Sequence, residues 1–239
     1  MRHFNTNNKE AKDALDVLIK NDVKVEEYRN AFRTLGLQLG DNLKKLISRG
    51  ERILVACASE DADWLAKGVL EKLPVDVGLA VFWSDRIKVC DNPKIEISPI
   101  IKSYIDINGD YDTVVIVKSI ISTSCVVKSQ INNLLGNVSP SKIYVLAPVM
   151  YKDAETSLRT EFPPTISEKF VFMSLAIDDE RNKSGVVIPG VGGWVYPKLG
   201  LGDIHSKNEY MPEIVTERMV EVNMVCEDKK NNISSPPIV

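Results

Sequence analysis

Hydroxyl and thiol side chains gather after a short apolar run of the sequence: Ser122, Thr123, Ser124 and Cys125. The run itself, Thr113–Val117, is followed by Lys118. Capping is the simplest role for the hydroxyls, because their oxygens can accept hydrogen bonds from the free amides of a helix expected at 126–135. A ligand site is the alternative, because open α/β sheets bind ligands beyond the carboxyl ends of their strands.

Five apolar runs rich in Val and Ile predict buried strands: Ile53–Ala58, Val77–Trp83, Thr113–Val117, Lys142–Ala147 and Phe170–Ile177. Helix-like stretches at 61–73 and 126–135 lie between some of these runs. Alternation of strand and helix implies parallel pairing with right-handed crossovers. We therefore expect an α/β fold, with one open parallel sheet of about five strands flanked by helices.

The first 50 residues are expected to form a helical arm. Apolar residues between Tyr28 and Leu46 recur at spacings of three and four, which makes one stripe for packing in a core or a dimer. The α/β domain is expected over 51–226. The polar residues 227–239 are expected to form a frayed tail.

Composition excludes several classes of function. The net charge of −3 provides no overall positive field for nucleic acid or an anionic membrane, so binding to either is not expected. The four cysteines and two histidines lack the spacing of a metal site, so no metal is predicted. Neither a signal-peptide core nor an apolar stretch of about 20 residues is present, which favours the cytoplasm.

The stretch from Ala176 to Gly192 resembles the signature of the uracil phosphoribosyltransferases, A-I-D-x-x-L-N-x-x-G-Y-I-V-P-G-L-G-D. The matching residues fall at unbroken spacing: Ala176, Ile177, Asp178, Asn182, Gly185, Pro189, Gly190 and Gly192. A weaker likeness runs from about residue 26 to about residue 202. The resemblance implies a type I phosphoribosyltransferase fold with a C-terminal hood at about 178–210.

In that family the hood holds the edge of uracil through backbone groups. The base-site candidates that follow from the resemblance are Asp178, Ile188, Pro189, Gly190, Gly192, Trp194 and Tyr196. Asp178 could position a base or a ribose, although fixing the turn before Asn182 is the simpler role. Trp194 and Tyr196 could stack on a base, and sealing a core or a subunit contact is the alternative.

The family's ribose-phosphate loop, D-P-M-L-A-T-G-G-S, corresponds here to residues 117–125. Thr123 is retained between two serines, so the resemblance adds a phosphate cradle at a helix N-terminus to the possible roles of this loop. Lys118 replaces an acidic residue, and it could contact a phosphate or be solvated at the strand end. Ser124 and Cys125 replace glycines that would let the backbone approach a phosphate closely.

Further departures fall on the same substrate, phosphoribosyl pyrophosphate. The family's R-A-G loop corresponds to Glu60-Asp61-Ala62, which reads as the acidic first turn of a helix. A second arginine corresponds to Ser84, with Arg86 close by. Like charges at a pyrophosphate site oppose binding. Ordinary uracil salvage is therefore not expected, and no catalytic residue is assigned.

Three functions remain compatible with this pattern. The first is a divergent enzyme or sensor for a nucleotide- or nucleoside-like molecule. The second is an inactive pseudoenzyme that serves as an interaction subunit of a larger assembly, of the kind found in defence or toxin systems. The third is an active phosphoribosyltransferase in which the ribose-phosphate loop has been aligned to the wrong residues. No cofactor is expected except Mg²⁺, which would accompany a bound pyrophosphate donor. The resemblance also implies a homodimer or a higher oligomer.

Overall fold

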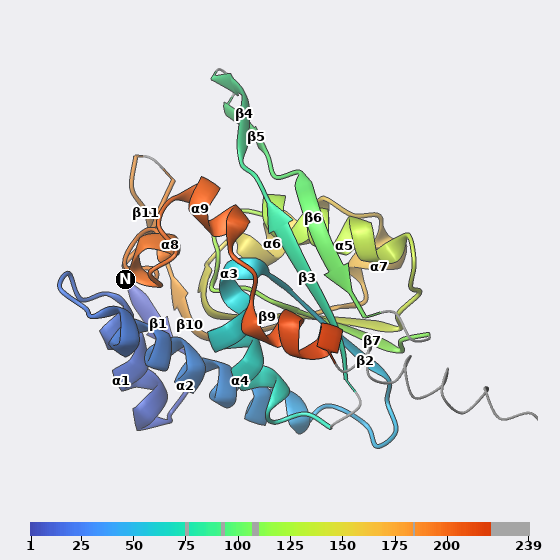
Figure 1. Cartoon of the computed structure of the whole chain (residues 1–239). Coiled ribbons are helices and arrows are strands. Elements are labelled where there is room, and N and C mark those ends of the chain that lie inside the picture. Colours follow the sequence, from blue (N-terminus) through green and yellow to red (C-terminus); the bar gives the residue numbers. More distant parts are fainter. Residues whose placement is uncertain (75–76, 92–93, 107–109, 184, 221–239) are drawn as a thin grey trace, which may run out of the picture.

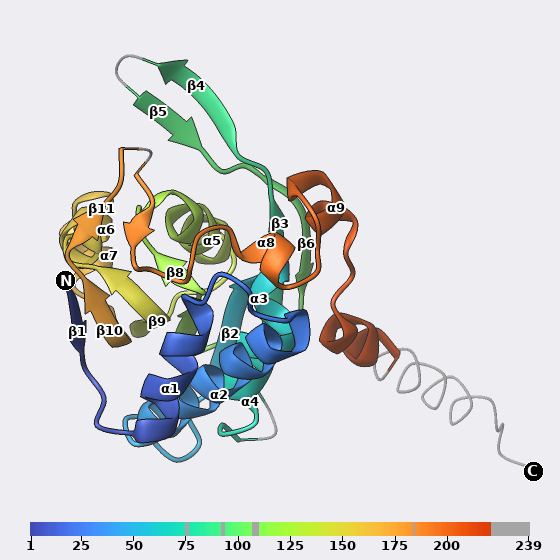
Figure 2. The same cartoon turned by 90° about the vertical axis from the view of Figure 1, so that its left-hand side faces the viewer.

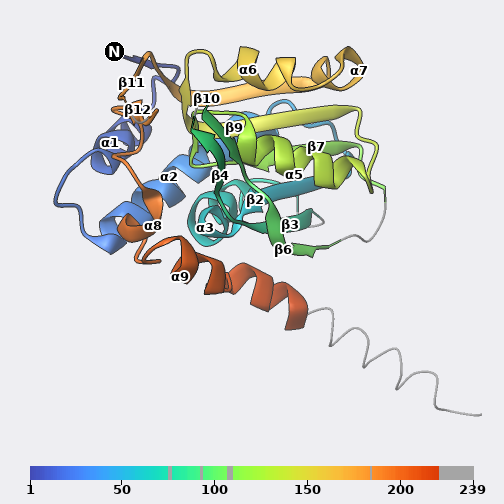
Figure 3. The same cartoon turned by 90° about the horizontal axis from the view of Figure 1, so that it is seen from above.

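A computed structural model describes residues 1–74, 77–91, 94–106, 110–183 and 185–220. The tail predicted at 227–239 lies outside the described residues. A central sheet carries helices on both faces (Figures 1 and 3). The predicted α/β class, an open and mostly parallel sheet flanked by helices, is therefore confirmed.

Five parallel strands form the middle of the sheet in the order β3-β2-β7-β9-β10. They lie at the five predicted apolar runs: β2 (Ile53–Ala58), β3 (Gly78–Ser84), β7 (Thr113–Val117), β9 (Lys142–Tyr151) and β10 (Phe170–Asp178). β2, β3 and β7 are buried along their whole length, as strands covered on both faces must be. Their parallel register brings their carboxyl ends to one edge of the sheet.

Several strands were not predicted. β1 (Arg2–Phe4) pairs antiparallel with β10, and β6 (Ile100–Ile105) pairs antiparallel with β3. The short β8 (Ile120–Ile121) pairs with β9. Two hairpins lie off the sheet: β4 (Ile87–Asp91) with β5 (Lys94–Ile97), and β11 (Glu180–Arg181) with β12 (Val187–Ile188). The β4–β5 hairpin projects away from the body (Figures 1 and 2).

The first 50 residues form two helices rather than one, α1 (Lys9–Leu18) and α2 (Val25–Lys44). Both pack into the core that covers one face of the sheet, together with side chains of β2 and β7. The predicted stripe is buried from Tyr28 to Leu43. Leu46 is 48% exposed because α2 ends before it.

α2 crosses a second helical stretch in direct backbone contact. This stretch runs from α3 (Ser59–Asp61) through a π-helical turn at Ala62–Ala66 into α4 (Lys67–Leu70), and it begins two residues before the predicted helix. A Cβ atom on Gly36 would lie 2.2 Å from the carbonyl oxygen of Leu65, so only glycine permits this approach.

The opposite face is covered by α5 (Cys125–Leu135), α6 (Ala154–Thr160) and α7 (Pro164–Ser167). The chain then forms α8 (Val195–Lys198), α9 (Ile204–Glu209) and a helical stretch at 213–220. In the described part of the chain, none of the helices combines the length and the apolar character of a membrane span.

Candidate functional site

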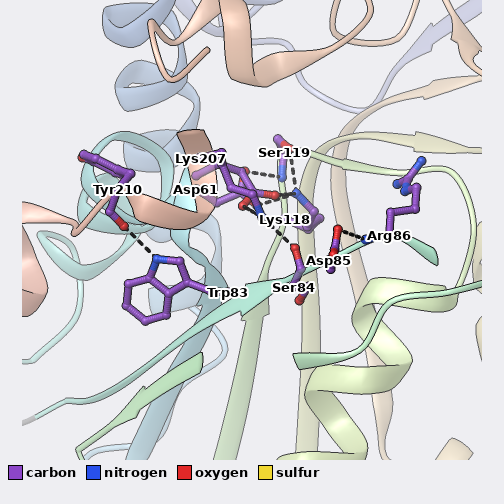
Figure 4. Close-up of polar contacts among 10 residues, drawn as sticks. Asp61, Trp83, Ser84, Asp85, Arg86, Lys118, Ser119, Lys207 and Tyr210 are labelled. Carbon is purple, nitrogen blue, oxygen red and sulfur yellow. Dashed lines mark hydrogen bonds and ion pairs between the residues drawn. The ribbon is translucent and has the colours of Figure 1, made fainter. Parts of the chain in front are cut away.

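Two carboxylates and two ammonium groups meet at the carboxyl ends of β2, β3 and β7. Lys118 follows β7, and its Nζ donates to Glu60 Oε1 at 3.1 Å and to Asp61 Oδ2 at 2.6 Å. The Nζ of Lys207, which comes from α9, lies 3.7 Å from Glu60 Oε2. All four side chains are at least 90% buried. We call these residues the charged cluster, and Figure 4 shows Lys118 directed at Asp61 with Lys207 beside them.

Burial and charge oppose each other in this cluster. Burial would lower the pKa of Lys118, but the carboxylates of Asp61 and Glu60 raise it above its ordinary value. Burial raises the pKa of Asp61 to about 6, although Lys118 opposes the shift. Burial would also raise the pKa of Glu60, but Lys118 and Lys207 lower it overall. Burial lowers the pKa of Lys207, although the Glu60 carboxylate opposes that shift.

Hydrogen bonding in the cluster is incomplete. Ser119 completes one side, since its amide donates to Asp61 Oδ1 at 3.2 Å and its hydroxyl accepts from Lys118 at 3.1 Å. Three other buried atoms, Glu60 Oε2, Ser59 Oγ and Ser84 Oγ, have no hydrogen-bond partner. Most buried polar atoms in folded proteins are paired, so such a group of unpaired atoms marks a place where a water or a ligand group would be stabilised.

These contacts answer two of the alternatives raised by the sequence. Glu60 and Asp61 do lie in the first turn of a helix, but they are 4% and 2% exposed rather than solvated. Lys118 is 8% exposed, so it is not a solvated lysine at a strand end. Its ammonium group is occupied by carboxylates of the same chain. Lys118 and the acidic residues Glu60 and Asp61 are therefore partners whose charges compensate each other.

The hydroxyl loop does not cap α5. Ser124 occupies the position before the helix, but its side chain makes no capping bond and instead donates to Glu161 Oε1 at 3.3 Å. Ser122 donates to the carbonyl oxygen of Gly185 at 3.3 Å, which joins this loop to the hood. Thr123 is exposed, and Cys125 begins the helix. The first turn of α5 therefore lacks the side-chain cap that the simpler interpretation required.

Asp178 holds the hood in place rather than the turn at Asn182. Its carboxylate accepts from Arg2 Nε and Nη2, both at 2.8 Å, and from the amide of Gly190 at 2.8 Å. Arg2 Nη2 also donates to the carbonyl oxygen of Gly190 at 2.5 Å. Gly190 has φ of 57°, a conformation that favours glycine, and its carbonyl contact with Arg2 explains why the turn is needed. Asp178 is fully buried and is thus committed to structure.

Of the two aromatic residues of the hood, Tyr196 lies beside the charged cluster and Trp194 lies at the surface. Tyr196 is mostly buried, and its ring centroid lies 5.4 Å from Lys207 Nζ. Burial and the nearby Glu60 carboxylate raise the pKa of Tyr196 to about 12. Trp194 is 56% exposed, and the guanidinium of Arg86 lies 5.5 Å from the centroid of its ring. Ile188 is 44% exposed on β12, just before Pro189 in the hood, and Gly192 packs against the backbone of Leu18.

Sequence reasoning missed Lys207 and Arg2, which complete the two buried ion pairs. Neither residue lies in an apolar pattern that would signal burial, since a lysine after a glycine-rich loop and an arginine near the start normally face solvent. The described residues contain no group of three or more His, Cys, Asp or Glu side chains placed to share a metal ion. Glu60 and Asp61 are already paired with lysines, so they do not fit the Mg²⁺ that would accompany a pyrophosphate donor.

Comparison with known proteins finds similarity only in three dimensions. No family model and no curated protein matches the sequence. The AQ2163 protein of Aquifex aeolicus superposes with a TM-score of 0.67 at 16% identity, covering 81% of this chain and 95% of that one.

Two phosphoribosyltransferases superpose less fully. The orotate phosphoribosyltransferase of Mycobacterium tuberculosis, in complex with 5-phospho-α-D-ribosyl 1-diphosphate, has a TM-score of 0.42 at 10% identity, with 71% and 89% of the two chains covered. The adenine phosphoribosyltransferase of Thermoanaerobacter pseudethanolicus has a TM-score of 0.39 at 12% sequence identity, with 64% of this chain and 83% of that one covered. The chain therefore has an open, mostly parallel α/β architecture like that of the AQ2163 protein, and no uracil-specific relationship is shown.

Proposed function

We propose that this chain binds a nucleotide- or nucleoside-like small molecule at the carboxyl edge of its sheet and does not carry out ordinary uracil phosphoribosylation. The charged cluster is the observation that carries the proposal. It lies where open α/β sheets bind ligands, it is buried, and its polar atoms are incompletely paired. Most buried polar atoms in folded proteins are paired, so the unpaired Glu60 Oε2, Ser59 Oγ and Ser84 Oγ at one sheet edge favour a place for a further polar group.

The cluster also argues against pyrophosphate transfer. A transferase must neutralise a departing pyrophosphate with cations or metal ions. Here Lys118 is held by Asp61 and Glu60, and the place of the expected arginine is anionic. A pyrophosphate would have to displace these carboxylates from Lys118 and would meet their negative charge. We therefore expect no pyrophosphate release from a phosphoribosyl donor.

Three features next to the cluster suit a ligand with one phosphate and a base. The first turn of α5 has no side-chain cap, and free amides at a helix N-terminus attract an anion. Arg86 is exposed, and its guanidinium, 5.5 Å from the centroid of the Trp194 ring, can supply a positive charge. Trp194 presents an exposed indole on which a base can stack.

Isothermal titration calorimetry with uridine 5′-monophosphate and the other nucleoside monophosphates tests the proposal. We expect saturable binding by the intact chain. Trp194→Ala should weaken it by about 1–3 kcal/mol, the usual value of base stacking on an aromatic ring. Leu46→Ala, at an exposed residue far from the edge, is the matched control. Absence of binding by every nucleotide would contradict the proposal.

A coupled assay for pyrophosphate release, with phosphoribosyl pyrophosphate, Mg²⁺ and uracil, separates binding from transfer. No release above the rate without protein is expected. Release that depends on Thr123 would instead support an active transferase, because this is the one residue of the hydroxyl loop that keeps the family's identity.

A second candidate function, an interaction subunit, is favoured by the β4–β5 hairpin. The hairpin projects from the body (Figures 1 and 2) and exposes Ile87, Val89 and Ile97 at 44%, 58% and 46%. Exposed apolar side chains on one projection are typical of protein contacts. A partner that copurifies with the wild type and with Thr123→Ala, but not with a Val89→Ser, Ile97→Ser double variant, would support this function.

A further inference from the structure

The C-terminal strap, defined here as residues 203–218, crosses the carboxyl edge beside α3 and β3 (Figures 1 and 3). It contains α9 and most of the helical stretch that follows. It starts directly after Gly202, whose φ of 70° is a conformation that favours glycine. The strap is therefore a short helical segment that leaves the hood through a glycine turn.

Contacts fasten the strap to the domain along its length. At its far end Ile214 and Val215 are buried in the core, and Arg218 donates to Asp106 Oδ2 at 3.2 Å and to the carbonyl oxygen of Val77 at 3.0 Å.

The ring of Tyr210 stacks on Trp64 with centroids 6.1 Å apart, and the carbonyl oxygen of Tyr210 accepts from Trp83 Nε1 at 2.7 Å. The carboxylate of Asp63 accepts from the Tyr210 hydroxyl and from the amides of Glu213 at 2.8 Å and Ile214 at 3.0 Å. Tyr210 and Asp63 are thus the main fasteners of its middle.

Lys207 is the part of the strap that reaches the charged cluster. Its Nζ donates to the carbonyl oxygen of Ser84 at 2.9 Å, and its side chain is 2% exposed (Figure 4). Its contact with Glu60 Oε2, at 3.7 Å, is too long for a hydrogen bond. The hydroxyls of Ser59 and Ser84 remain unpaired. Lys207 therefore fills the place beside Glu60 and satisfies the Ser84 carbonyl oxygen, but it leaves Glu60 Oε2 without a hydrogen bond.

We propose that the strap is a gate over the charged cluster, with Lys207 as an internal plug that a ligand replaces. When Lys207 leaves, the groups that become available are the Oε2 atom of Glu60 and the carbonyl oxygen of Ser84. Both are acceptors, so the part of the ligand that enters beneath the strap donates hydrogen bonds, as ribose hydroxyls or an amine do. A phosphate is excluded from this position because it would face Glu60.

The identity of the ligand rests on the function proposed above, whereas the opening of the strap does not. A gate that is open in a minor fraction of molecules reduces the apparent affinity by that fraction. If the open state is populated at 10% or less, a typical range for a minor state, releasing the strap should tighten binding by about tenfold or more.

Hydrogen–deuterium exchange on the wild-type chain without ligand tests the gate alone. The amides of Lys207 and Tyr210, which donate to Asp203 and Ser206, should exchange faster than those of β2 and β7. Strap amides that exchange as slowly as the central strands would overturn the gate, whatever the ligand turns out to be.

Calorimetry with uridine and with uridine 5′-monophosphate tests the effect on binding. Tyr210→Ala removes the stacking and the hydroxyl contact, and Asp63→Asn weakens the anchor without changing the aromatic packing. Both should tighten binding by about tenfold or more, whereas Lys44→Gln, at an exposed residue outside the strap and the cluster, should not change it. Unchanged affinity in both strap variants would overturn the plug. Absence of binding in every variant, with fast exchange of the strap, would instead reject the ligand and leave the gate supported.

Discussion

Two buried ion pairs lie at opposite ends of the same sheet edge. Their carboxylates, Asp178 and Glu60, differ in how many of their oxygens accept hydrogen bonds. Near β10, the Asp178 carboxylate receives hydrogen bonds from Arg2 and from the Gly190 amide. Near β2 and β3, Glu60 keeps one oxygen without a hydrogen bond although two lysines lie beside it. Both oxygens of the Asp178 carboxylate are therefore bonded, although Arg2 Nη1 is a buried atom without a partner, whereas Glu60 has one oxygen available to another molecule.

In both regions a segment from near one end of the described chain supplies a cation. Arg2 lies on β1, which is paired with a strand of the sheet along its length. Lys207 lies on a six-residue helix that is held mainly by side chains. Backbone pairing fixes the first cation firmly, and the second can leave at a lower cost. Arg2 therefore belongs to a fixed contact, and Lys207 belongs to the proposed gate. The following changes test that distinction.

Lys118→Met should have the largest effect on stability. It leaves Glu60 and Asp61 buried side by side without their shared cation, and breaking a buried pair in this way typically costs about 3–5 kcal/mol. Urea unfolding gives the free energy directly, with Lys142→Met at an exposed strand end as the control. A loss below about 1 kcal/mol, the range of surface pairs, would mean that water reaches the cluster.

Asp178→Asn should destabilise the chain by about 1.5–3 kcal/mol, the usual value of hydrogen bonds to a charged group. The hood should loosen around Gly190 because its amide loses a charged acceptor. Exchange of the strap amides should not change, since no contact links Asp178 to the strap among the described residues. Faster exchange at both ends of the edge would show that the two regions are not independent.

The pH dependence of stability should separate the two regions further. The pKa of Asp61 is raised from 3.8 to about 6, so the folded state holds a proton that the unfolded state has already released between these values. The contribution of Asp61 to stability is thus fully present below about pH 4 and is lost as the pH rises through 6. Asp61→Asn should remove this loss, which urea unfolding from pH 4 to 7 measures. Parallel curves for the two proteins would contradict the raised pKa.

Glu60→Gln should have the smallest effect on stability, about 1.5 kcal/mol, the low end for hydrogen bonds to a charged group, because Lys118 keeps Asp61 as its partner and only Lys207 loses its carboxylate. The pKa of Asp61 should fall from about 6 but stay above its ordinary value, since burial is the larger cause of the shift. Carboxyl chemical shifts followed by NMR against pH report this pKa. An unchanged value would show that Glu60 does not act on Asp61.

The central strands could be predicted because burial on both faces leaves a continuous apolar run, as at Ile53–Ala58. The edge strands could not, since β1 and β6 are exposed on one side and carry polar residues such as Arg2 and Lys102. The sequence placed Lys118 and the hydroxyl loop beyond the end of a strand, and the charged cluster that contains Lys118 lies at that edge of the sheet. The ion pair between Lys118 and Asp61 could not be predicted, because the two residues are 57 positions apart in the sequence.

The glycine crossing between α2 and the π-helical turn has a consequence for motion at the edge. Gly36 and Gly68 let the two backbones touch, and any side chain at either position would collide with a carbonyl oxygen. The helical stretch that starts with Glu60 and Asp61 is therefore clamped against α2 and has no room to rock. The acidic side of this edge is therefore rigid, and the proposed motion is confined to the segment after Gly202 that carries Lys207.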